Sequence, residues 1–473
     1  MFTLLPLATE DIAIVDGDTG QSITYDQLCS TATSVAQLFG RTKALIFLFC
    51  KNNIPCVTAY LAGLEHGHVV CLLDDQMRPE LKAQLIAQYR PDYVVGFQAE
   101  LMWDGFAPLE SPLIDLHVWR CIHSQHMALH PELSLLLSTS GTTGSPKLIR
   151  LTKHNVIQNA LAIKEYLAIN RSERAIASLP MHYSYGLSVL NSHLLAGASI
   201  VLTNKSVLEA DFWSSFNAHA CTSFAGVPYT YQILDRIGFH RFHLPTLRTM
   251  TQAGGKLDNK LVLKFHQLMQ SWQARLVVMY GQTEATARIA YLDPSYLPEK
   301  VGAIGNASPG GVLHLFDDAI EIQEANRVGE LVYEGPNVSM GYATNRQDLA
   351  KEDELQGCLR TGDLAYRDVE GFYFITGRLK RISKVYGLRI SLDEIEETLR
   401  HHGPVAVVGN DQVIALFFEN QSGSAPGQYI QELAGSFQLH PSTFRSYHLE
   451  QLPLTSSGKI DYPWLERYAN AGK

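Results

Sequence analysis

Strand-length apolar runs alternate with helix-like segments through residues 11–130, and this alternation limits the possible fold more than any other feature. The runs at 44–49 and 69–73 are continuous apolar stretches, which is typical of buried strands. A helix-like segment at 55–64 lies between them. Parallel strands need a long crossover connection of this kind. The pattern therefore predicts a mostly parallel sheet with helices on its faces.

The same alternation resumes between residues 154 and 280, and two later regions differ from it. From 302 to 377, short strand-like runs are separated by turns, which is typical of a small barrel or meander. Residues 381–473 combine helix-like and strand-like runs and are interpreted as a separate α+β unit. We therefore predict an α/β chain with a large domain at 1–379, which includes a barrel-like part at about 302–379, and a small mobile domain at 380–473.

Length, charge and cysteine content exclude several classes of protein. The chain has 473 residues, which suits two or more domains, and its net charge of −9 without a long basic run argues against nucleic acid or an anionic membrane as partner. No apolar run reaches the length of a membrane span, and no basic segment precedes Glu10 as in a signal peptide. The seven cysteines form no C-x-x-C pair, which favours reduced thiols in a cytoplasmic protein.

Residues 138–147 are rich in hydroxyls and glycine and follow a short apolar run, which predicts a loop. Successive backbone N–H groups, hydroxyl donors and one ammonium can cradle a polyphosphate. The common nucleotide P-loop has four residues between its glycines, whereas only Thr142 and Thr143 separate Gly141 from Gly144. The residues after the loop alternate like a strand, so we predict a strand, a phosphate loop and a second strand. By composition alone, an ordinary Ser/Gly loop fits equally well.

A second motif occupies residues 280–284 after another strand-like run. Its tyrosine could stack on a base, Thr283 could donate to a phosphate, and Glu284 could hold Mg²⁺, a hard cation that prefers oxygen ligands. The alternative is an ordinary strand-to-helix turn with Glu284 in the first helical turn.

Three further motifs are weak individually. Asp363 at a glycine turn can accept from both hydroxyls of a ribose, but it also fits a simple hairpin turn. Residues 377–387 carry several cations at the junction of the two predicted domains, although a charged run is usually a solvated face. Lys459 follows a glycine near the C-terminal end.

In this order, the motifs resemble those of the adenylate-forming superfamily, which includes acyl-CoA and aryl-CoA synthetases, fatty-acyl-AMP ligases, peptide-synthetase adenylation domains and luciferases. The resemblance extends from about Ile23 to Lys459. It implies a ligase that uses ATP and Mg²⁺ to convert a small carboxylic acid into an acyl-adenylate with release of pyrophosphate. The acyl group would then pass to a thiol, either CoA or the phosphopantetheine of a separate carrier protein.

The resemblance also implies roles for individual residues. The loop would bind the β- and γ-phosphates of ATP through Thr139, Ser140, Gly141, Thr142, Thr143, Gly144 and Lys147. The other nucleotide contacts would come from a glycine turn, the 280–284 motif and a ribose-binding pair: Gly254, Gly255, Tyr280, Gly281, Gln282, Thr283, Asp363 and Arg378. Glu284 would bind Mg²⁺, Lys459 would contact the carboxylate and α-phosphate during adenylation, and Lys380 would be the hinge between the domains.

The chemistry of such a reaction suits these residue types. A carboxylate and a polyphosphate, both anionic, must be brought together while negative charge moves onto pyrophosphate. Positioning and charge stabilisation therefore matter more than a strong base.

The predicted acyl pocket departs from the family pattern. Many acyl-CoA synthetases have a histidine where Tyr183 falls, and amino-acid-activating domains commonly have an aspartate there. His182 lies one position earlier. Since Tyr183 offers no carboxylate to a substrate ammonium, we do not expect an α-amino acid. Val227 and Tyr229 match the pocket wall, and the aromatic Tyr229 favours a bounded pocket. Simple packing is the alternative role for His182 and Tyr183.

Several functional alternatives remain. CoA and a carrier protein compete as the thiol acceptor, and the acyl group could instead pass to an amine. A catalytically inactive nucleotide-binding homologue and a luciferase-like oxidoreductase are the other possibilities. The intact Glu284, Asp363, Lys380 and Lys459 argue against loss of catalysis.

Overall fold

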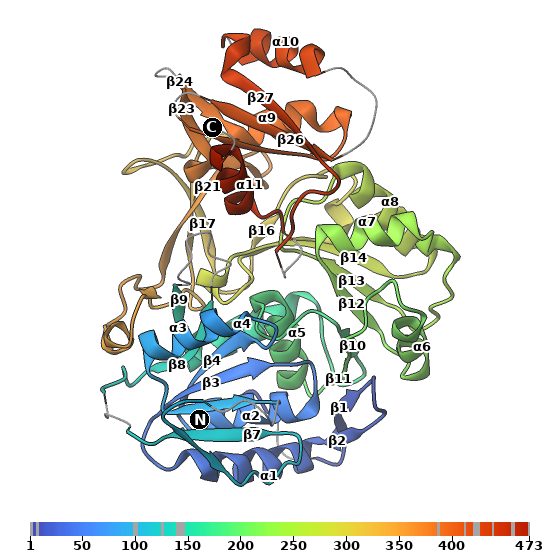
Figure 1. The fold of residues 1–473 in the computed structure, drawn as a ribbon. Coiled ribbons are helices and arrows are strands. Elements are labelled where there is room, and N and C mark those ends of the chain that lie inside the picture. Colours follow the sequence, from blue (N-terminus) through green and yellow to red (C-terminus); the bar gives the residue numbers. More distant parts are fainter. Residues whose placement is uncertain are drawn as a thin grey trace. The chain divides into compact units, whose positions relative to one another are not determined.

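The computed structural model describes residues 3–5, 9–97, 103–123, 127–138, 147–385, 388–410, 413–419, 426–437, 439–455 and 459–471. These residues form two compact units, and each is described by itself. The first unit contains the described residues up to 312 together with 334–359. The second contains 313–333 and the described residues from 360 onward. Figure 1 labels many of the elements of both units.

An eight-stranded sheet forms one half of the first unit. Its order is β20-β9-β8-β4-β3-β5-β7-β6. The strands are β3 (Leu45–Cys50), β4 (Val69–Asp74), β5 (Tyr93–Gly96), β6 (Phe106–Leu109), β7 (His117–Cys121), β8 (Leu133–Ser138), β9 (Leu148–Thr152) and β20 (Tyr342–Ala343). The preceding and connecting helices are α1 (Tyr25–Ala36), α2 (Ile54–Glu65) and α3 (Pro79–Tyr89). The central strands β5, β3, β4 and β8 are parallel, as predicted.

A nine-stranded sheet forms the other half, in the order β16-β15-β14-β13-β12-β10-β11-β1-β2. Its strands are β1 (Ile12–Asp16), β2 (Ser22–Thr24), β10 (Arg174–Ala177), β11 (Ser199–Leu202), β12 (Ser223–Gly226), β13 (Thr249–Gln252), β14 (Arg275–Tyr280), β15 (Ala290–Leu292) and β16 (Asn306–Ala307). The helices between them are α4 (Lys153–Tyr166), α5 (Ser184–Leu195), α6 (Ala210–Ala218), α7 (Pro228–Arg236) and α8 (Asn259–Ser271). The neighbouring strands β14, β13, β12, β10, β11 and β1 pair in parallel, which confirms the predicted α/β class.

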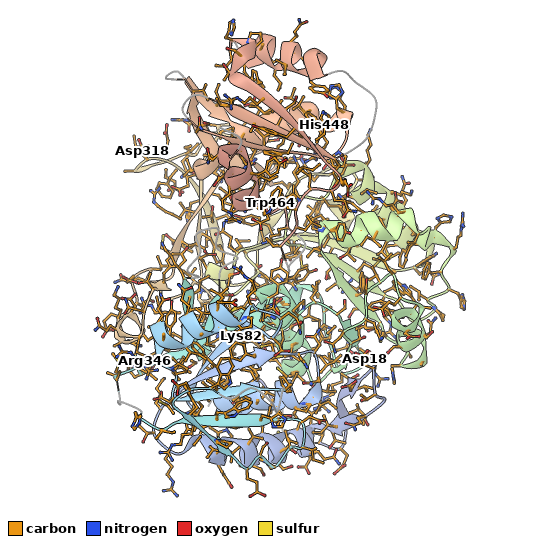
Figure 2. The ribbon with its side chains drawn as sticks, viewed as in Figure 1. Asp18, Lys82, Asp318, Arg346, His448 and Trp464 are labelled. Atoms are coloured by element: carbon orange, nitrogen blue, oxygen red, sulfur yellow. The ribbon has the colours of Figure 1, made fainter. Side chains whose placement is uncertain are left out.

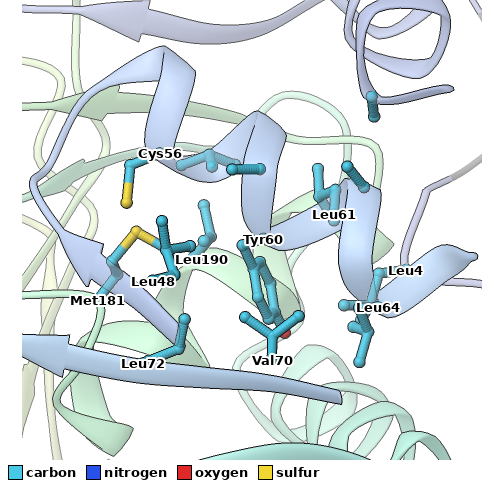
Figure 3. Close-up of a cluster of buried hydrophobic side chains, with 14 of the residues drawn as sticks. Leu4, Leu48, Cys56, Tyr60, Leu61, Leu64, Val70, Leu72, Met181 and Leu190 are labelled. Atoms are coloured by element: carbon cyan, nitrogen blue, oxygen red, sulfur yellow. The ribbon is translucent and has the colours of Figure 1, made fainter. Parts of the chain in front are cut away.

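The core beneath the eight-stranded sheet explains why α2 forms where it does. Asn53 caps the helix by accepting from the backbone N–H of Cys56, and Pro55 occupies its first turn. Figure 3 shows Tyr60 of α2 between Leu48 of β3 and Leu61, and all three side chains are buried. Full burial of each such side chain stabilises the fold by about 1.5–3 kcal/mol.

The second unit begins with a five-stranded sheet in the order β18-β17-β19-β21-β22. Its strands are β17 (Val312–Asp317), β18 (Ile320–Glu321), β19 (Gly329–Glu334), β21 (Cys358–Arg367) and β22 (Tyr373–Arg378). A hairpin and a three-stranded sheet follow: β23 (Ile382–Val385), β24 (Leu388–Ser391), β25 (Val405–Gly409), β26 (Ile414–Glu419) and β27 (Phe444–Leu449). Its helices are α9 (Leu392–Leu399), α10 (Pro426–Phe437) and α11 (Tyr462–Ala471).

The two compact units do not coincide with the predicted domains. The strands between 313 and 379 belong with the C-terminal residues rather than with the large sheets. Compact units describe packing in one arrangement, whereas a hinge is defined by movement between two arrangements. The boundary at 379 and the hinge at Lys380 therefore remain predictions.

The sequence analysis predicts that the chain has no membrane span and that its cysteines are reduced. Within the described ranges, no helix has the length and apolar character needed to cross a membrane. All seven cysteines are free thiols.

Candidate active site

The predicted phosphate loop connects two antiparallel strands of the eight-stranded sheet. β8 ends at Ser138, which pairs with Leu148 at the start of β9. The two strands predicted on either side of residues 139–146 are therefore confirmed. Lys147 directly precedes β9. The other predicted ligands of this loop lie outside the described residues: Thr139, Ser140, Gly141, Thr142, Thr143 and Gly144.

The 280–284 motif forms a tight turn at the end of β14. A Cβ built on Gly281 would lie 1.7 Å from the carbonyl oxygen of Ala287, so glycine is required for the chain to return this closely. The backbone then passes through Thr286 and Ala287 with φ angles of 58° and 112°. Positive φ is strained for residues that carry a side chain. A short 3₁₀ helix, Thr283–Ala285, does follow β14 and has Glu284 in its first turn, as in the alternative interpretation, and the strained residues come directly after it.

Asn337 holds this strained turn in place. Its Nδ2 donates to the carbonyl oxygens of Ala285 at 2.7 Å and Arg288 at 3.1 Å. The Thr286 hydroxyl donates to the Asn337 carbonyl oxygen at 2.6 Å. Strain of this kind persists only where the surrounding structure enforces it, and it is common at functional sites.

Substituting Gly281 with alanine should lower the free energy of unfolding of the first unit by about 1–3 kcal/mol. The added methyl group must displace backbone atoms of Ala287 and Arg288. Urea denaturation measures the change. Gly435→Ala in α10 is the matched control, since a Cβ there meets nothing within 4 Å and alanine is the better helix former. A loss below about 0.5 kcal/mol for Gly281→Ala would contradict the steric argument.

Glu284, Tyr342 and Lys147 come together from distant parts of the sequence. The Tyr342 hydroxyl donates to Glu284 Oε1 at 2.8 Å, and Lys147 Nζ lies 5.9 Å from the centre of the Tyr342 ring. β20 brings Tyr342 here by pairing with β9, where it lies opposite Ile149. Burial and the Glu284 carboxylate raise the pKa of Tyr342, so its hydroxyl stays protonated and can donate.

Arg150 fixes the segment that carries Tyr342. Its side chain on β9 is fully buried, and its Nη2 donates to Met340 O at 2.7 Å and to Glu354 Oε2 at 2.6 Å. Its Nη1 donates to Lys351 O at 2.6 Å. These bonds tie the chain on both sides of β20 to β9, so Arg150 positions Tyr342 without itself reaching Glu284.

Replacing Tyr342 with phenylalanine should slow the ATP-dependent reaction proposed below about tenfold, the equivalent of one hydrogen bond to a charged group. The ring stays in place while the hydroxyl that orients Glu284 is lost. Exchange of pyrophosphate into ATP measures the effect. Tyr468→Phe is the control, because that residue of α11 is 43% exposed and packs through its ring. Equal rates for the two variants would show that Tyr342 does not position Glu284.

The predicted pocket residues Tyr183, Val227 and Gly254 lie against one another. Tyr183 is the N-cap residue of α5, and Gly254 follows β13 with a φ of +88°. A Cβ at Gly254 would lie 2.5 Å from the Tyr183 hydroxyl and 3.2 Å from Val227 Cγ1. Burial raises the pKa of Tyr183 to about 12, so this hydroxyl is also protonated at neutral pH. The structure thus joins the predicted glycine turn to the predicted pocket entrance.

The remaining predicted residues of the first unit lie on the 280–284 motif, on α7 and in the turn after β13. The hydroxyl oxygens of Thr283 and Ser184 lie 2.9 Å apart, which connects the 280–284 turn to the start of α5. Gln282 Nε2 donates to the Tyr280 hydroxyl at 3.3 Å. Tyr229 on α7 is 39% exposed, and Gly255 follows Gly254 in the turn after β13.

His182 lies beside Asp74, a residue that sequence reasoning missed. His182 Nε2 is 3.9 Å from Asp74 Oδ2, and its Nδ1 is buried without a hydrogen-bond partner. Burial lowers the pKa of His182, and the Asp74 carboxylate partly opposes that shift. Asp74 is the last residue of the buried parallel strand β4. Polar residues at the carboxyl ends of parallel strands often belong to binding sites, and this signal could have identified it.

Asp363 and Arg378 lie opposite each other on β21 and β22 of the second unit. Arg378 Nε donates to Asp363 Oδ1 at 2.8 Å. The Asp363 side chain is 2% exposed, whereas that of Arg378 is 62% exposed. The residues predicted to contact the ribose therefore form a direct ion pair.

Lys459 lies in an exposed position of the second unit and is hydrogen-bonded to Thr455. Its backbone N–H donates to the Thr455 hydroxyl at 3.2 Å, and Thr455 N–H donates to the Lys459 carbonyl oxygen at 2.7 Å. An antiparallel bridge joins Leu454 to Ile460 around it. The backbone at Lys459 is thus held while its side chain is accessible. The side chain of Lys380 lies outside the described residues.

The structure therefore groups the predicted residues within each unit. In the first unit, Tyr342 contacts both Glu284, through a hydrogen bond, and Lys147, through its ring. Gly254 lies directly against the hydroxyl of Tyr183. Tyr342 and Asn337 carry no motif in the sequence, so no local signal could have identified them.

The chain belongs to the AMP-binding enzyme family, whose pattern matches residues 8–343. The predicted resemblance is thereby confirmed. Among curated proteins, a 2-succinylbenzoate–CoA ligase of Bacillus cereus is 30% identical, over 93% of this chain and 92% of the relative. The probable CoA ligase CCL5 of Humulus lupulus is 25% identical, over 92% of this chain and 83% of the relative.

Solved structures of an enzyme from Bacillus subtilis have the same fold. The o-succinylbenzoate CoA synthetase MenE in complex with its acyl-adenylate intermediate gives a TM-score of 0.77 at 22% identity, covering 97% of this chain and 96% of that one. The same synthetase in complex with ATP and magnesium ion also gives 0.77 at 22% identity, covering 97% of both chains.

Proposed function

We propose that this protein activates a small carboxylic acid with ATP, releases pyrophosphate and transfers the acyl group to the thiol of CoA. The observation that carries the proposal is the meeting of Lys147, Tyr342 and Glu284 beside the start of β9. An ammonium and an oriented carboxylate next to a glycine- and hydroxyl-rich loop suit a site for magnesium-bound polyphosphate. The relatives named as CoA ligases support the same reaction.

Glu284 fits the magnesium ion that such a reaction uses. Its Oε1 accepts from Tyr342, and no hydrogen bond to its Oε2 occurs among the described residues. A partly exposed carboxylate oxygen is the ligand that this hard cation prefers. When bound, Mg²⁺ neutralises charge on the phosphates of ATP.

The proposed roles of the other residues follow from charge and hydrogen bonding. Lys147, with Thr142 and Thr143, stabilises the departing pyrophosphate, and Thr283 donates to a phosphate. Tyr280 stacks on the adenine beside Gly254 and Gly255. Asp363, held by Arg378, accepts from the ribose hydroxyls. Lys459 neutralises the acid carboxylate and the α-phosphate as they approach, and Lys380 is the hinge for the second half-reaction.

CoA is the favoured acceptor because it is named in the relatives that match most of the chain. Transfer to the phosphopantetheine of a carrier protein uses the same thiol chemistry and is the first alternative, ahead of transfer to an amine. The seven free cysteines suit a reducing compartment such as the cytoplasm.

The decisive experiment is ATP–pyrophosphate exchange with the purified chain across aliphatic, aromatic and amino acids. We expect exchange with at least one acid that lacks an α-amino group, and formation of its CoA thioester when CoA is added. Exchange without thioester formation would favour a carrier protein or an amine. Failure of every acid to support exchange would contradict the enzyme proposal.

A further inference from the structure

Arg288 differs from the other deeply buried arginines of this chain. Arg150, Arg288 and Arg346 are 0%, 2% and 4% exposed. Arg150 pairs with the Glu354 carboxylate at 2.6 Å, and Arg346, labelled in Figure 2, pairs with the Asp92 carboxylate at 3.1 Å. Arg288 pairs with no carboxylate in the part of the chain that the structure describes. A buried charge without a counterion is unfavourable, so a guanidinium in this position calls for an anion.

The neutral contacts of Arg288 leave part of its guanidinium available. Nε donates to the Ser188 hydroxyl at 3.1 Å, and Nη1 donates to the Tyr166 hydroxyl at 3.2 Å and to the sulfur of Met279. The guanidinium also lies 4.5 Å from the centre of the Tyr185 ring. No described residue accepts a hydrogen bond from Nη2. These contacts orient the planar group while leaving donors suited to a carboxylate.

Arg288 lines a cavity behind α5 that has about 20 Å³ of space for the centre of a water molecule. The space is large enough for at least one small polar group. Ser192, His193, Ser223 and Thr251 line the cavity beside Arg288, and the rest of its wall is mostly apolar. In such surroundings little water screens the guanidinium, so an anion that reaches it is bound strongly.

Arg288 is the positively charged group of the cavity, because the other titratable groups that line it are neutral or already paired. Burial lowers the pKa of His193 to about 4, and its Nδ1 donates to Val189 O at 2.9 Å, so the ring is neutral. Glu173 also lines the cavity, but it faces Arg248 at 3.6 Å and accepts from the Thr222 hydroxyl. That carboxylate is therefore already engaged.

The cavity adjoins the predicted acyl pocket. Val189 and Ala225 line it and belong to the same buried cluster as Val227 and Ala253, against which Tyr183 packs. The ring centres of Tyr183 and Tyr185 lie 6.2 Å apart, and Tyr185 also contacts Arg288. Tyr185 therefore links the Tyr183 side of the predicted pocket to Arg288.

We infer that the acid substrate carries a second carboxylate, which Arg288 binds at the inner end of the acyl pocket. This inference rests on the proposed function, because it names the substrate class for that site. The carboxylate to be activated remains at the pocket entrance, and the distal carboxylate supplies the counterion that Arg288 lacks. The substrate is therefore a short dicarboxylic acid, with the cavity volume disfavouring a long chain.

Matched acids test this inference in the unmodified protein. Glutarate against pentanoate and terephthalate against 4-methylbenzoate differ only in a carboxylate that replaces a methyl group. ATP–pyrophosphate exchange should show a kcat/KM at least about 100-fold higher for the dicarboxylate of an accepted pair. The dicarboxylates should also raise the melting temperature more than their partners, which reports binding without turnover.

Variants then assign the preference to Arg288. Arg288→Gln should reduce the preference to near unity, mainly by raising KM for the dicarboxylate, and Arg288→Lys should retain part of it. Arg346→Gln is the control for loss of a buried arginine: it should lower thermal stability and leave the ratio between the two acids unchanged.

Two results would overturn the inference while leaving the proposed ligase intact. One is a preference of the unmodified protein for the methyl-bearing acids. The other is an equal loss of activity toward both acids of a pair in Arg288→Gln, which would indicate a purely structural arginine. Absence of exchange with every acid would instead overturn the proposed function itself.

Discussion

Replacing Lys459 with alanine should lower ATP–pyrophosphate exchange by about 10²–10³-fold, the loss typical of removing one charge-stabilising donor. Lys459 is proposed to neutralise the acid carboxylate and the α-phosphate as they approach. Its side chain is exposed and its backbone is held by Thr455, so the substitution should leave the fold unchanged. The exchange rate under saturating ATP and acid measures the effect.

The two half-reactions provide an internal comparison for this variant. CoA transfer from a supplied acyl-adenylate should be affected far less, because the proposed role of Lys459 ends with adenylation. Arg445→Ala, which removes an exposed cation from β27 of the same unit, is the matched control and should retain both activities. Exchange within about threefold of the unmodified protein would exclude the role proposed for Lys459, since a loss that small is under 1 kcal/mol.

Replacing Glu284 with glutamine should lower exchange by a similar factor, about 10²–10³-fold, and raise the Mg²⁺ concentration needed for half-maximal rate. Glutamine keeps an oxygen that can accept from Tyr342, so the geometry of the turn is preserved. What is lost is the negative charge that holds the cation. Exchange measured across a Mg²⁺ titration separates this loss from a general loss of activity.

The control for this variant is Glu299→Gln, which removes an exposed carboxylate of the same unit. It should leave the Mg²⁺ titration unchanged. If Glu284→Gln shows the Mg²⁺ dependence of the unmodified protein, another group holds the cation. Together with Tyr342→Phe, the series distinguishes the charge of Glu284 from its orientation.

The regular elements near the proposed site were predictable because their signals are local. The buried run at 69–73 became β4, and the segment between the first two buried runs became α2 with its Asn53 cap. The order of strand, loop and strand around Lys147 followed from alternation alone. Hydrophobic periodicity reports which faces are buried, and that determines secondary structure wherever propensity agrees with it.

The partners of the site residues were not predictable because they depend on topology. Tyr342 reaches Glu284 across 58 residues of sequence, since β20 pairs with β9 at the sheet edge. Asn337 likewise contacts the residues directly after the 280–284 motif, and Asp74 lies beside His182, each from another element. A hydrogen bond between distant residues leaves no periodicity in either segment, so neither residue forms a recognisable motif.

The α/β class, the family and the residues proposed to bind ATP were predictable from the linear sequence, because each rests on a short pattern or on burial periodicity. The three-dimensional structure shows that Gly281 permits a strained turn and that Tyr342 donates to Glu284. It alone distinguished Arg288 from Arg150 and Arg346, because the three arginines look alike in the sequence. Whether a buried guanidinium has a counterion is a property of packing, and packing brings together residues whose proximity the linear sequence does not record.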